Sequence, residues 1–190
     1  MNSRGRGSLL VLSGPSGVGK TTIARRLREV PGIVRVMTTT TRARRPQEVD
    51  GRDYRFLTRP EFEAAIARGE FLEYAEIDGN LYGSPRAAIE RELEAGRVVL
   101  VDIDPQGARS VRALGLPALF VFVAPPDMQE LRRRLEGRRS ESPEEVRRRL
   151  ARAEREMNER HLYDLVVVND RVERAVEEIL SAVRARGLLN

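Results

Sequence analysis

A glycine-rich segment near the N-terminus constrains this chain more than any other feature. It runs from Gly14 to Thr21 and reads Gly-Pro-Ser-Gly-Val-Gly-Lys-Thr, which matches the pattern G-x-x-x-x-G-K-[ST]. The apolar stretch Leu9–Leu12 before it is typical of a β-strand, and a helical pattern begins near Lys20. In such a loop the glycines let successive backbone N–H groups point at a phosphate, and the following helix adds its positive N-terminus. The sequence therefore predicts a nucleotide-phosphate loop between a strand and a helix.

The lysine of this loop is the only lysine in the chain. Of the 34 basic residues, every one except Lys20 is arginine. A compact ammonium reaches β and γ phosphate oxygens from inside such a loop, and the hydroxyl of Thr21 is suited to Mg²⁺. The residue usage thus indicates that position 20 requires an ammonium.

Short apolar runs alternate with helical patterns along the rest of the chain. The runs stand at Leu9–Leu12, Val98–Val101, Leu119–Val123 and Leu165–Val168. Helices are expected to begin near Lys20, Ala87, Met128, Glu144 and Arg171. This alternation of strand and helix patterns predicts the α/β class, with a central parallel sheet covered by helices on both faces in three α/β/α layers.

Between Val36 and Ser84 the pattern changes. Short strand-like pieces, Tyr54–Leu57 and Leu72–Ile77, flank one predicted helix near Pro60–Arg68. We interpret this stretch as a small α+β insertion within a single domain, because the 190 residues show no linker or break in composition.

The composition of the chain excludes several kinds of functional site and indicates the charge of its partners. The chain has no cysteine, which excludes disulfides, thiolate metal sites and cysteine nucleophiles. The longest apolar run is too short to span a membrane and the N-terminal run is too short for a signal peptide, so we expect a cytoplasmic protein without a membrane partner. The net charge of +5 favours anionic partners, and no RNA-binding signature accompanies it, so we expect no nucleic acid partner.

Many arginines are spaced four residues from a glutamate. Glu144 with Arg148, Glu145 with Arg149 and Arg152 with Glu156 are examples. Such pairs are typical of a solvated helix face, and we interpret them as having no functional role. The sequence Ser142-Pro143-Glu144-Glu145 predicts the start of this helix, with an N-cap serine and a capping-box glutamate.

Two carboxylates follow the predicted strand Val98–Val101. Asp102 and Asp104 are two residues apart, so they project to the same side of an extended segment, at the edge where ligands bind in such sheets. Asp102 is interpreted as a group that organises Mg²⁺, and Asp104 as a group that faces a second substrate. The alternative is that either residue only caps a turn at Pro105–Gly107.

The insertion carries side chains suited to a nucleoside monophosphate. It contains an arginine-rich segment at Thr38–Pro46 and two tyrosines, Tyr54 and Tyr82. Arginines and tyrosine hydroxyls donate to phosphate oxygens. Glu73 is able to accept from the N1–H and 2-amino group of guanine while Ser84 donates to its O6. Ser84 is alternatively a helix N-cap before Pro85, and the tyrosines are alternatively packing residues.

Together these motifs resemble the guanylate kinase family, from about Ser8 to Arg186. The resemblance rests on T-T-R-x-x-R-P at residues 40–46, D-G-x-D-Y at 50–54, G-N-x-Y-G-S at 79–84, and Val101-Asp102-Ile103-Asp104. It implies one guanylate-kinase-like domain over residues 1–190, with a P-loop NTPase core at 8–36 and 85–190, a GMP-binding insertion at 37–84 and a helical lid at 134–150.

The resemblance also implies a role for each site residue. The implied catalytic residues are Lys20, Arg138, Arg149 and Asp102, with Arg139 as an alternative to Arg138. The implied ATP-binding residues are Gly14, Pro15, Ser16, Gly17, Val18, Gly19, Lys20, Thr21, Thr22, Arg134, Arg138 and Asn169, the last near the adenine. The implied GMP-binding residues are Thr38, Arg42, Arg45, Tyr54, Glu73, Tyr82, Ser84 and Asp104. Thr21 and Asp102 would hold the metal, mostly indirectly.

The implied reaction converts ATP and GMP to ADP and GDP by direct in-line transfer with Mg²⁺, in purine nucleotide metabolism and GMP recycling. The sequence is compatible with a monomer or a homo-oligomer. Two alternatives stay open at this point: a peptide-binding module that keeps the fold, against which the complete phosphate loop argues, and a kinase for another small molecule such as a ribose phosphate.

Overall fold

The structure is a computed structural model that describes residues 6–137 and 142–189. Arg138 and Arg139, and with them the central part of the expected lid, lie outside the described residues.

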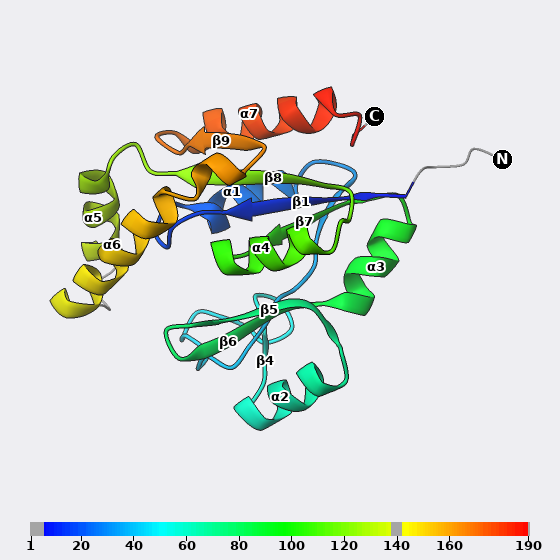
Figure 1. Cartoon of the computed structure of the whole chain (residues 1–190), viewed down its shortest axis with the longest axis horizontal. Coiled ribbons are helices and arrows are strands. Elements are labelled where there is room, and N and C mark those ends of the chain that lie inside the picture. The colour runs from blue at the N-terminus through cyan, green and yellow to red at the C-terminus, as the bar shows by residue number, and fades with distance from the viewer. Residues whose placement is uncertain (1–5, 138–141, 190) are drawn as a thin grey trace.

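A parallel sheet forms the centre of the molecule (Figure 1). In the described part of the chain it has five strands in the order β2-β7-β1-β8-β9, and every pair is parallel. The strands are β1 (Ser8–Ser13), β2 (Ile33–Arg35), β7 (Val98–Asp102), β8 (Ala118–Ala124) and β9 (Leu165–Val168). The predicted parallel sheet is confirmed, and β2 is an edge strand that the sequence pattern did not predict.

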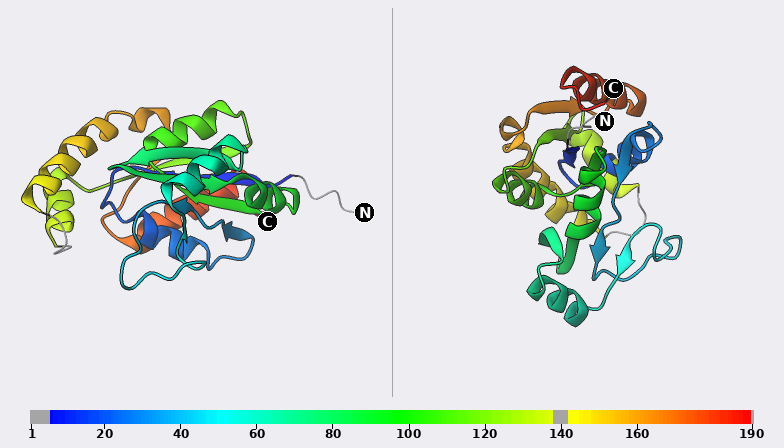
Figure 2. Two further views of the ribbon diagram at one scale, coloured as in Figure 1. Left: turned by 90° about the horizontal axis from the view of Figure 1, so that it is seen from below. Right: turned by 90° about the vertical axis from the view of Figure 1, so that its right-hand side faces the viewer.

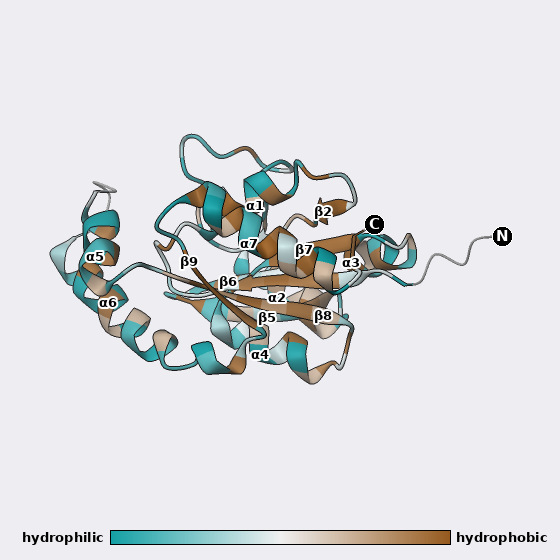
Figure 3. Cartoon of the chain, turned by 90° about the horizontal axis from the view of Figure 1, so that it is seen from above, coloured by the Kyte–Doolittle hydropathy of each residue, from teal (hydrophilic) through white to brown (hydrophobic). Residues whose placement is uncertain are grey.

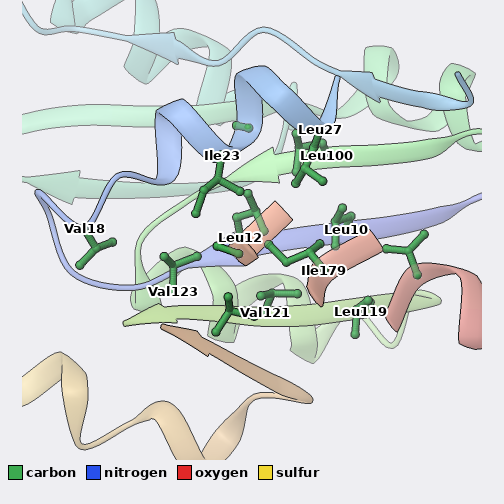
Figure 4. Close-up of a cluster of buried hydrophobic side chains, with 14 of the residues drawn as sticks. Leu10, Leu12, Val18, Ile23, Leu27, Leu100, Leu119, Val121, Val123 and Ile179 are labelled. Atoms are coloured by element: carbon green, nitrogen blue, oxygen red, sulfur yellow. The ribbon is translucent and has the colours of Figure 1, made fainter. Parts of the chain in front are cut away.

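Helices cover both faces of this sheet because alternate residues of each strand point to opposite sides. On one face Leu10 and Leu12 of β1 pack in a core with α1 (Lys20–Leu27) and α7 (Val172–Ala185), and this core extends to α5 (Met128–Glu136) and α6 (Pro143–Met157) (Figure 4). On the other face Leu9 and Val11 pack with α3 (Arg86–Glu94) and α4 (Pro105–Ala113). The three-layer α/β/α prediction is confirmed.

The insertion forms a second, smaller sheet (Figures 1 and 2). Its order is β4-β3-β6-β5, and its elements are β3 (Thr39–Thr40), β4 (Arg55–Phe56), α2 (Arg59–Ala67), β5 (Phe71–Ile77) and β6 (Asn80–Pro85). Phe62 of α2 stacks on Phe71 of β5 with ring centroids 4.4 Å apart, in a small core of its own. The predicted α+β insertion is therefore present, and it extends away from the central sheet.

Helix α4 lies between the central sheet and β5, which brings the insertion to the end of β7 (Figure 1). The sequence reading of residues 105–107 as a turn is wrong, because they form the first turn of α4. Pro105 occupies the first helical position, where its missing N–H costs no hydrogen bond, and Asp104 is the N-cap.

The interpretation of Ser84 as a helix N-cap is also wrong. Ser84 belongs to β6, and Pro85 is the residue that precedes the first turn of α3. A serine in a strand directs its hydroxyl to one face of the sheet, so Ser84 is available for a contact with the neighbouring strand β5.

Helix α6 begins as the sequence predicts. The Ser142 hydroxyl accepts from the Glu145 N–H at 3.2 Å, and the Glu145 carboxylate accepts from the Ser142 N–H at 2.7 Å. These two bonds satisfy backbone donors that the first turn leaves free. The cap matters because many side chains of α6 are hydrophilic (Figure 3), and in its first turn Val146 is the side chain that is buried in the core.

Replacing Ser142 by alanine is expected to lower the free energy of unfolding by about 1 kcal/mol, because one of the two capping bonds is lost. Urea unfolding followed by circular dichroism measures the difference. Ser181→Ala, an exposed serine inside α7, is the matched control and should change stability little. Equal effects of the two substitutions would show that the cap contributes nothing.

Candidate active site

The loop from Gly14 to Thr21 connects the carboxyl end of β1 to α1. Gly14 has a φ of 130°, and a Cβ there would lie 2.2 Å from the Val123 carbonyl oxygen of β8, so no other residue fits. The Lys20 ammonium lies inside the loop and donates to the carbonyl oxygens of Gly14 at 2.6 Å and Pro15 at 3.0 Å. The loop therefore wraps around the lysine at the N-terminus of a helix, where backbone N–H groups attract a phosphate.

Two predicted ATP-binding residues lie behind this loop. The Asn169 side-chain amide donates to the Val18 carbonyl at 2.7 Å, and Asn169 is 3% exposed. Arg134 of α5 donates to the Asn169 carbonyl at 3.0 Å and to the Val18 carbonyl at 3.4 Å. Both side chains hold the loop backbone in place from β9 and α5.

A cleft lies between the phosphate loop and the insertion. It consists of two adjoining cavities that share Ser16, Lys20, Thr21, Tyr54, Ile77, Asp78, Tyr82 and Arg149. We call them the acidic end and the basic end. The acidic end is also lined by Thr38, Glu73, Asp102, Asp104, Arg152 and Glu156. The basic end is also lined by Gly17, Gly19, Thr22, Arg42, Arg45 and Asn80.

Glu73 lines the acidic end, and Ser84 lies behind it as its hydrogen-bonding partner. The two residues face each other in the antiparallel pair of β5 and β6, and the Ser84 hydroxyl donates to Glu73 Oε1 at 2.5 Å. Glu73 is only 6% exposed. Burial raises the pKa of the Glu73 carboxyl to about 7, and the negative charge of Asp104 adds to this, while the Ser84 hydrogen bond acts in the opposite direction.

Gly107 in the first turn of α4 packs directly against the Glu73 carboxylate. A Cβ at Gly107 would lie 2.6 Å from Glu73 Oε2, closer than real Cβ contacts. The sequence reading did not single out this residue. The sequence patterns contain no signal for it, because they predict no helix at residues 105–113, whereas in the structure Gly107 lies inside α4, where alanine would be more stable by about 1 kcal/mol.

Asp104 caps a helix, as one of the two alternatives from the sequence proposed, and it also lines the acidic end. One carboxylate oxygen caps α4 by accepting from the Gly107 N–H at 2.8 Å. The other accepts from Arg152 Nη2 of α6 at 2.9 Å, and the side chain lines the acidic end. Arg152 Nε also donates to Glu156 at 2.7 Å, and Glu156 is 8% exposed. The interpretation of Arg152 and Glu156 as a solvated pair without a role is therefore wrong.

Side chains that can donate hydrogen bonds to a phosphate line the basic end of the cleft. Arg42 Nη2 donates to both carboxylate oxygens of Glu48, at 2.8 and 3.0 Å, and the Arg45 N–H donates to Glu48 Oε2 at 2.9 Å. The Arg42 guanidinium lies 5.6 Å from the ring centroid of Tyr54, which in turn packs edge-on against Tyr82. Glu48 is a residue that sequence reasoning missed, and it holds the arginine-rich loop in shape.

Asp102 lines the acidic end of the cleft, next to the phosphate loop. It is the last residue of β7, and burial raises the pKa of its carboxyl, while the positive charges of Lys20 and Arg35 oppose that shift. Thr21 lies beside it and hydrogen bonds to it. Among the described residues no group of three or more His, Cys, Asp or Glu side chains is arranged to hold a metal ion. A metal here would need ligands from a bound molecule.

The remaining predicted residues fall around the same cleft. Thr38 is 8% exposed and lines the acidic end, and Thr22 lines the basic end. Arg149 of α6 lines both ends. In the described part of the chain no helix is long and apolar enough to cross a membrane.

Comparison with known proteins identifies the family. The family model described as guanylate kinase matches residues 6–186. A guanylate kinase of Rubrobacter xylanophilus is 51% identical over 180 residues, which are 94% of each chain. One of Dechloromonas aromatica is 49% identical and covers 96% of this chain and 91% of its own.

A solved structure agrees with these sequence matches. The crystal structure of guanylate kinase from Anaplasma phagocytophilum is 37% identical, with a TM-score of 0.80, and the match covers 95% of this chain and 86% of that one. With a complete phosphate loop and a buried Glu73 carboxylate facing one cleft, the chain belongs to the guanylate kinase family of nucleoside monophosphate kinases.

Proposed function

We propose that this chain transfers the γ-phosphoryl group of ATP directly to the phosphate of GMP, giving ADP and GDP. The observation that carries the proposal is the position of Glu73, hydrogen-bonded by Ser84, at the opposite end of the same cleft from the arginines of the insertion. A carboxylate and a hydroxyl match the hydrogen-bonding edge of guanine, and the arginines match a phosphate.

ATP would bind with its phosphates in the loop from Gly14 to Thr21. The N-terminus of α1 offers backbone N–H groups, and Lys20 has only to turn from the loop carbonyls to reach phosphate oxygens. Arg134 and Asn169 support this site by holding the Val18 carbonyl. Arg149, which faces both ends of the cleft, is suited to the charge that develops between the two substrates.

GMP would bind between the insertion and α4. Its phosphate would meet Arg42, Arg45 and the hydroxyls of Tyr54 and Tyr82, and its base would meet Glu73 and Ser84. Thr38 and Asp104 would complete the acidic end, where both line the cavity. This arrangement supports the proposal that residues 37–84 form a GMP-binding subregion of the single domain.

Thr21 and Asp102 fit a magnesium ion that enters with ATP. One hydroxyl and one carboxylate, adjacent to each other, are the kind of protein ligands that Mg²⁺ uses when phosphate oxygens and water complete its shell. When bound there, the ion neutralises charge on the phosphate oxygens. The chain's own residues then align the two phosphates: Lys20 and Arg149 hold the transferred group, and Arg42 and Arg45 hold the acceptor.

No enzyme nucleophile is needed for this reaction. The acceptor oxygen of GMP is already anionic, so the residues of the cleft contribute positioning, charge neutralisation and exclusion of water. A coupled assay with GMP, AMP, CMP, UMP and IMP tests the proposal. Strong preference for GMP is the expected result, and comparable rates with AMP would overturn it.

Lys20→Arg is expected to lower kcat by about a hundredfold or more without unfolding the protein, because a planar guanidinium does not fit inside the loop. Steady-state kinetics with GMP and ATP measure the loss. Arg25→Lys, an exposed exchange in the same helix, is the control and should leave kcat unchanged. A kcat of Lys20→Arg within about threefold of the wild type would contradict the assignment.

Glu73→Gln is expected to reduce the kcat/KM ratio of GMP over AMP, which complementarity of this kind raises by up to about four decades. An amide satisfies only part of guanine's paired donors, whereas it offers adenine a donor. Ser84→Ala removes one hydrogen bond and should have the smaller effect. An unchanged GMP/AMP ratio in Glu73→Gln would mean that the base is recognised elsewhere.

The same carboxyl predicts a pH dependence. Guanine's donors need an ionised acceptor, and the Glu73 pKa is raised to about 7, so the KM for GMP should fall as pH rises through that value. The phosphate of GMP itself titrates near pH 6, and comparison with Glu73→Gln separates the two groups. The variant should lose the dependence near pH 7 and keep the one that belongs to the substrate.

Gly107→Ala is expected to raise the KM for GMP by about tenfold and leave the KM for ATP unchanged, because the new methyl group displaces the Glu73 carboxylate. In a Glu73→Ala background there is no carboxylate to displace, and the same substitution should raise the free energy of unfolding by about 1 kcal/mol, since alanine is the better helix former. Thermal unfolding of the four proteins gives this double-mutant cycle. Equal effects of Gly107→Ala in both backgrounds would refute the role of the contact.

A further inference from the structure

Arg152 joins two carboxylates that face the acidic end of the cleft. Its Nη2 donates to Asp104 Oδ2 at 2.9 Å, and its Nε donates to Glu156 Oε1 at 2.7 Å. The side chains of Asp104 and Glu156 are 11% and 10% exposed, whereas that of Arg152 is 29% exposed. One guanidinium thus serves two carboxylates that are largely removed from water.

The negative charge of Asp104 acts on two neighbouring carboxyls, those of Glu73 and Glu156. Burial raises the pKa of Glu156, and the charge of Asp104 adds to this, while Arg152 acts in the opposite direction. The charge of Asp104 also raises the pKa of Glu73. Without a shared cation, carboxylates in so dry a place either protonate or move apart. Arg152 therefore favours the ionised form of Glu156 and holds both Glu156 and Asp104 in their present positions.

Arg152 also fixes helix α6 relative to the central sheet. It is three residues after Arg149, so both project from the same face of α6. Through Asp104, the Arg152 guanidinium attaches this face to the N-terminus of α4, against which Glu73 packs. The helix that carries Arg149 is in this way tied to the part of the cleft that holds Glu73.

We propose that Arg152 is a positioning residue of the nucleoside monophosphate site, which holds Asp104 and Glu156 in place at the acidic end. This inference rests on the proposed function. It assigns no contact between Arg152 and the substrate. The group that Arg152 positions is the purine-reading end of the site rather than the ATP loop.

The proposal predicts how the site responds to pH. Glu73 is faced by Ser84 from β6 and by Asp104 from the β7–α4 connection. Asp104 is faced by the Gly107 N–H and Arg152, and Glu156 by Arg152, Lys20 and Asp104. Arg152 itself is also near Asp78. Arg152 lowers the pKa of Glu156, so removing its charge raises that pKa, and the pH midpoint of GMP binding should move upward from that of the wild type.

The test is equilibrium binding of GMP alone and of ATP alone by calorimetry, between about pH 6 and pH 9, in the full chain. The variants are Arg152→Gln and Arg152→Lys. Arg148→Gln is the matched control, since Arg148 is exposed on the same helix and the change in charge is the same. Thermal unfolding of each protein accompanies the titrations.

Arg152→Gln should weaken GMP binding by about tenfold, the loss expected for a charge-assisted hydrogen bond, and shift the midpoint of its pH dependence upward. ATP binding should stay within about twofold. Arg152→Lys should restore the pH midpoint but only part of the affinity, because an ammonium keeps the charge and lacks the fork that reaches both carboxylates. Arg148→Gln should match the wild type.

Three results would overturn the inference: a wild-type GMP affinity and pH midpoint in Arg152→Gln, the same change in Arg148→Gln, or equal losses for GMP and ATP together with a lower Tm. The last would mean that Arg152 only stabilises the fold. Failure of the proposed function looks different, because the wild type itself would then neither bind nor phosphorylate GMP. If Arg152→Gln does not fold, Arg152→Lys with a wild-type GMP affinity also overturns the inference.

Discussion

The burial of the Glu73 carboxylate is the constraint on which the rest of the site depends. Because Glu73 is only 6% exposed, its carboxylate needs hydrogen-bonding partners, and residues of three structural elements surround it. The register of β5 and β6 places the Ser84 hydroxyl on it, α4 approaches it through a glycine without a side chain, and Asp104 caps that same helix. The Glu73 carboxyl group is therefore a point of contact between the insertion and the central part of the domain.

This meeting point explains why the first turn of α4 has its unusual composition. Pro105 starts the helix, Gly107 gives up helix propensity, and Asp104 uses its two oxygens for two different helices. Taken singly, each of these residues lowers the stability of the helix or raises it only a little. Taken together, they bring a helix terminus within contact of Glu73 and leave a negative charge on each side of the space where a base would lie.

Local patterns were enough to predict the fold and the types of residue in the site. Strand periodicity found β1, β7, β8 and β9, and the capping box found the start of α6, because these signals depend on neighbouring residues. The contacts of Arg152 and Gly107 depend on residues 48 and 34 positions away. An arginine four residues before a glutamate looks the same on a solvated helix and on one that faces a cleft, so the sequence reading assigned Arg152 to solvent.

The choice between lysine and arginine follows the spacing of the acceptors at each position. Arg42 reaches both oxygens of Glu48, Arg134 reaches the carbonyls of Val18 and Asn169, and Arg152 reaches Asp104 and Glu156. A rigid fork suits these separated acceptors. Lys20 instead lies within a tight loop, against the carbonyls of two adjacent residues, and a phosphate would require it to turn. A flexible point charge meets that demand, which gives a physical reason for the single lysine in a chain that otherwise uses arginine.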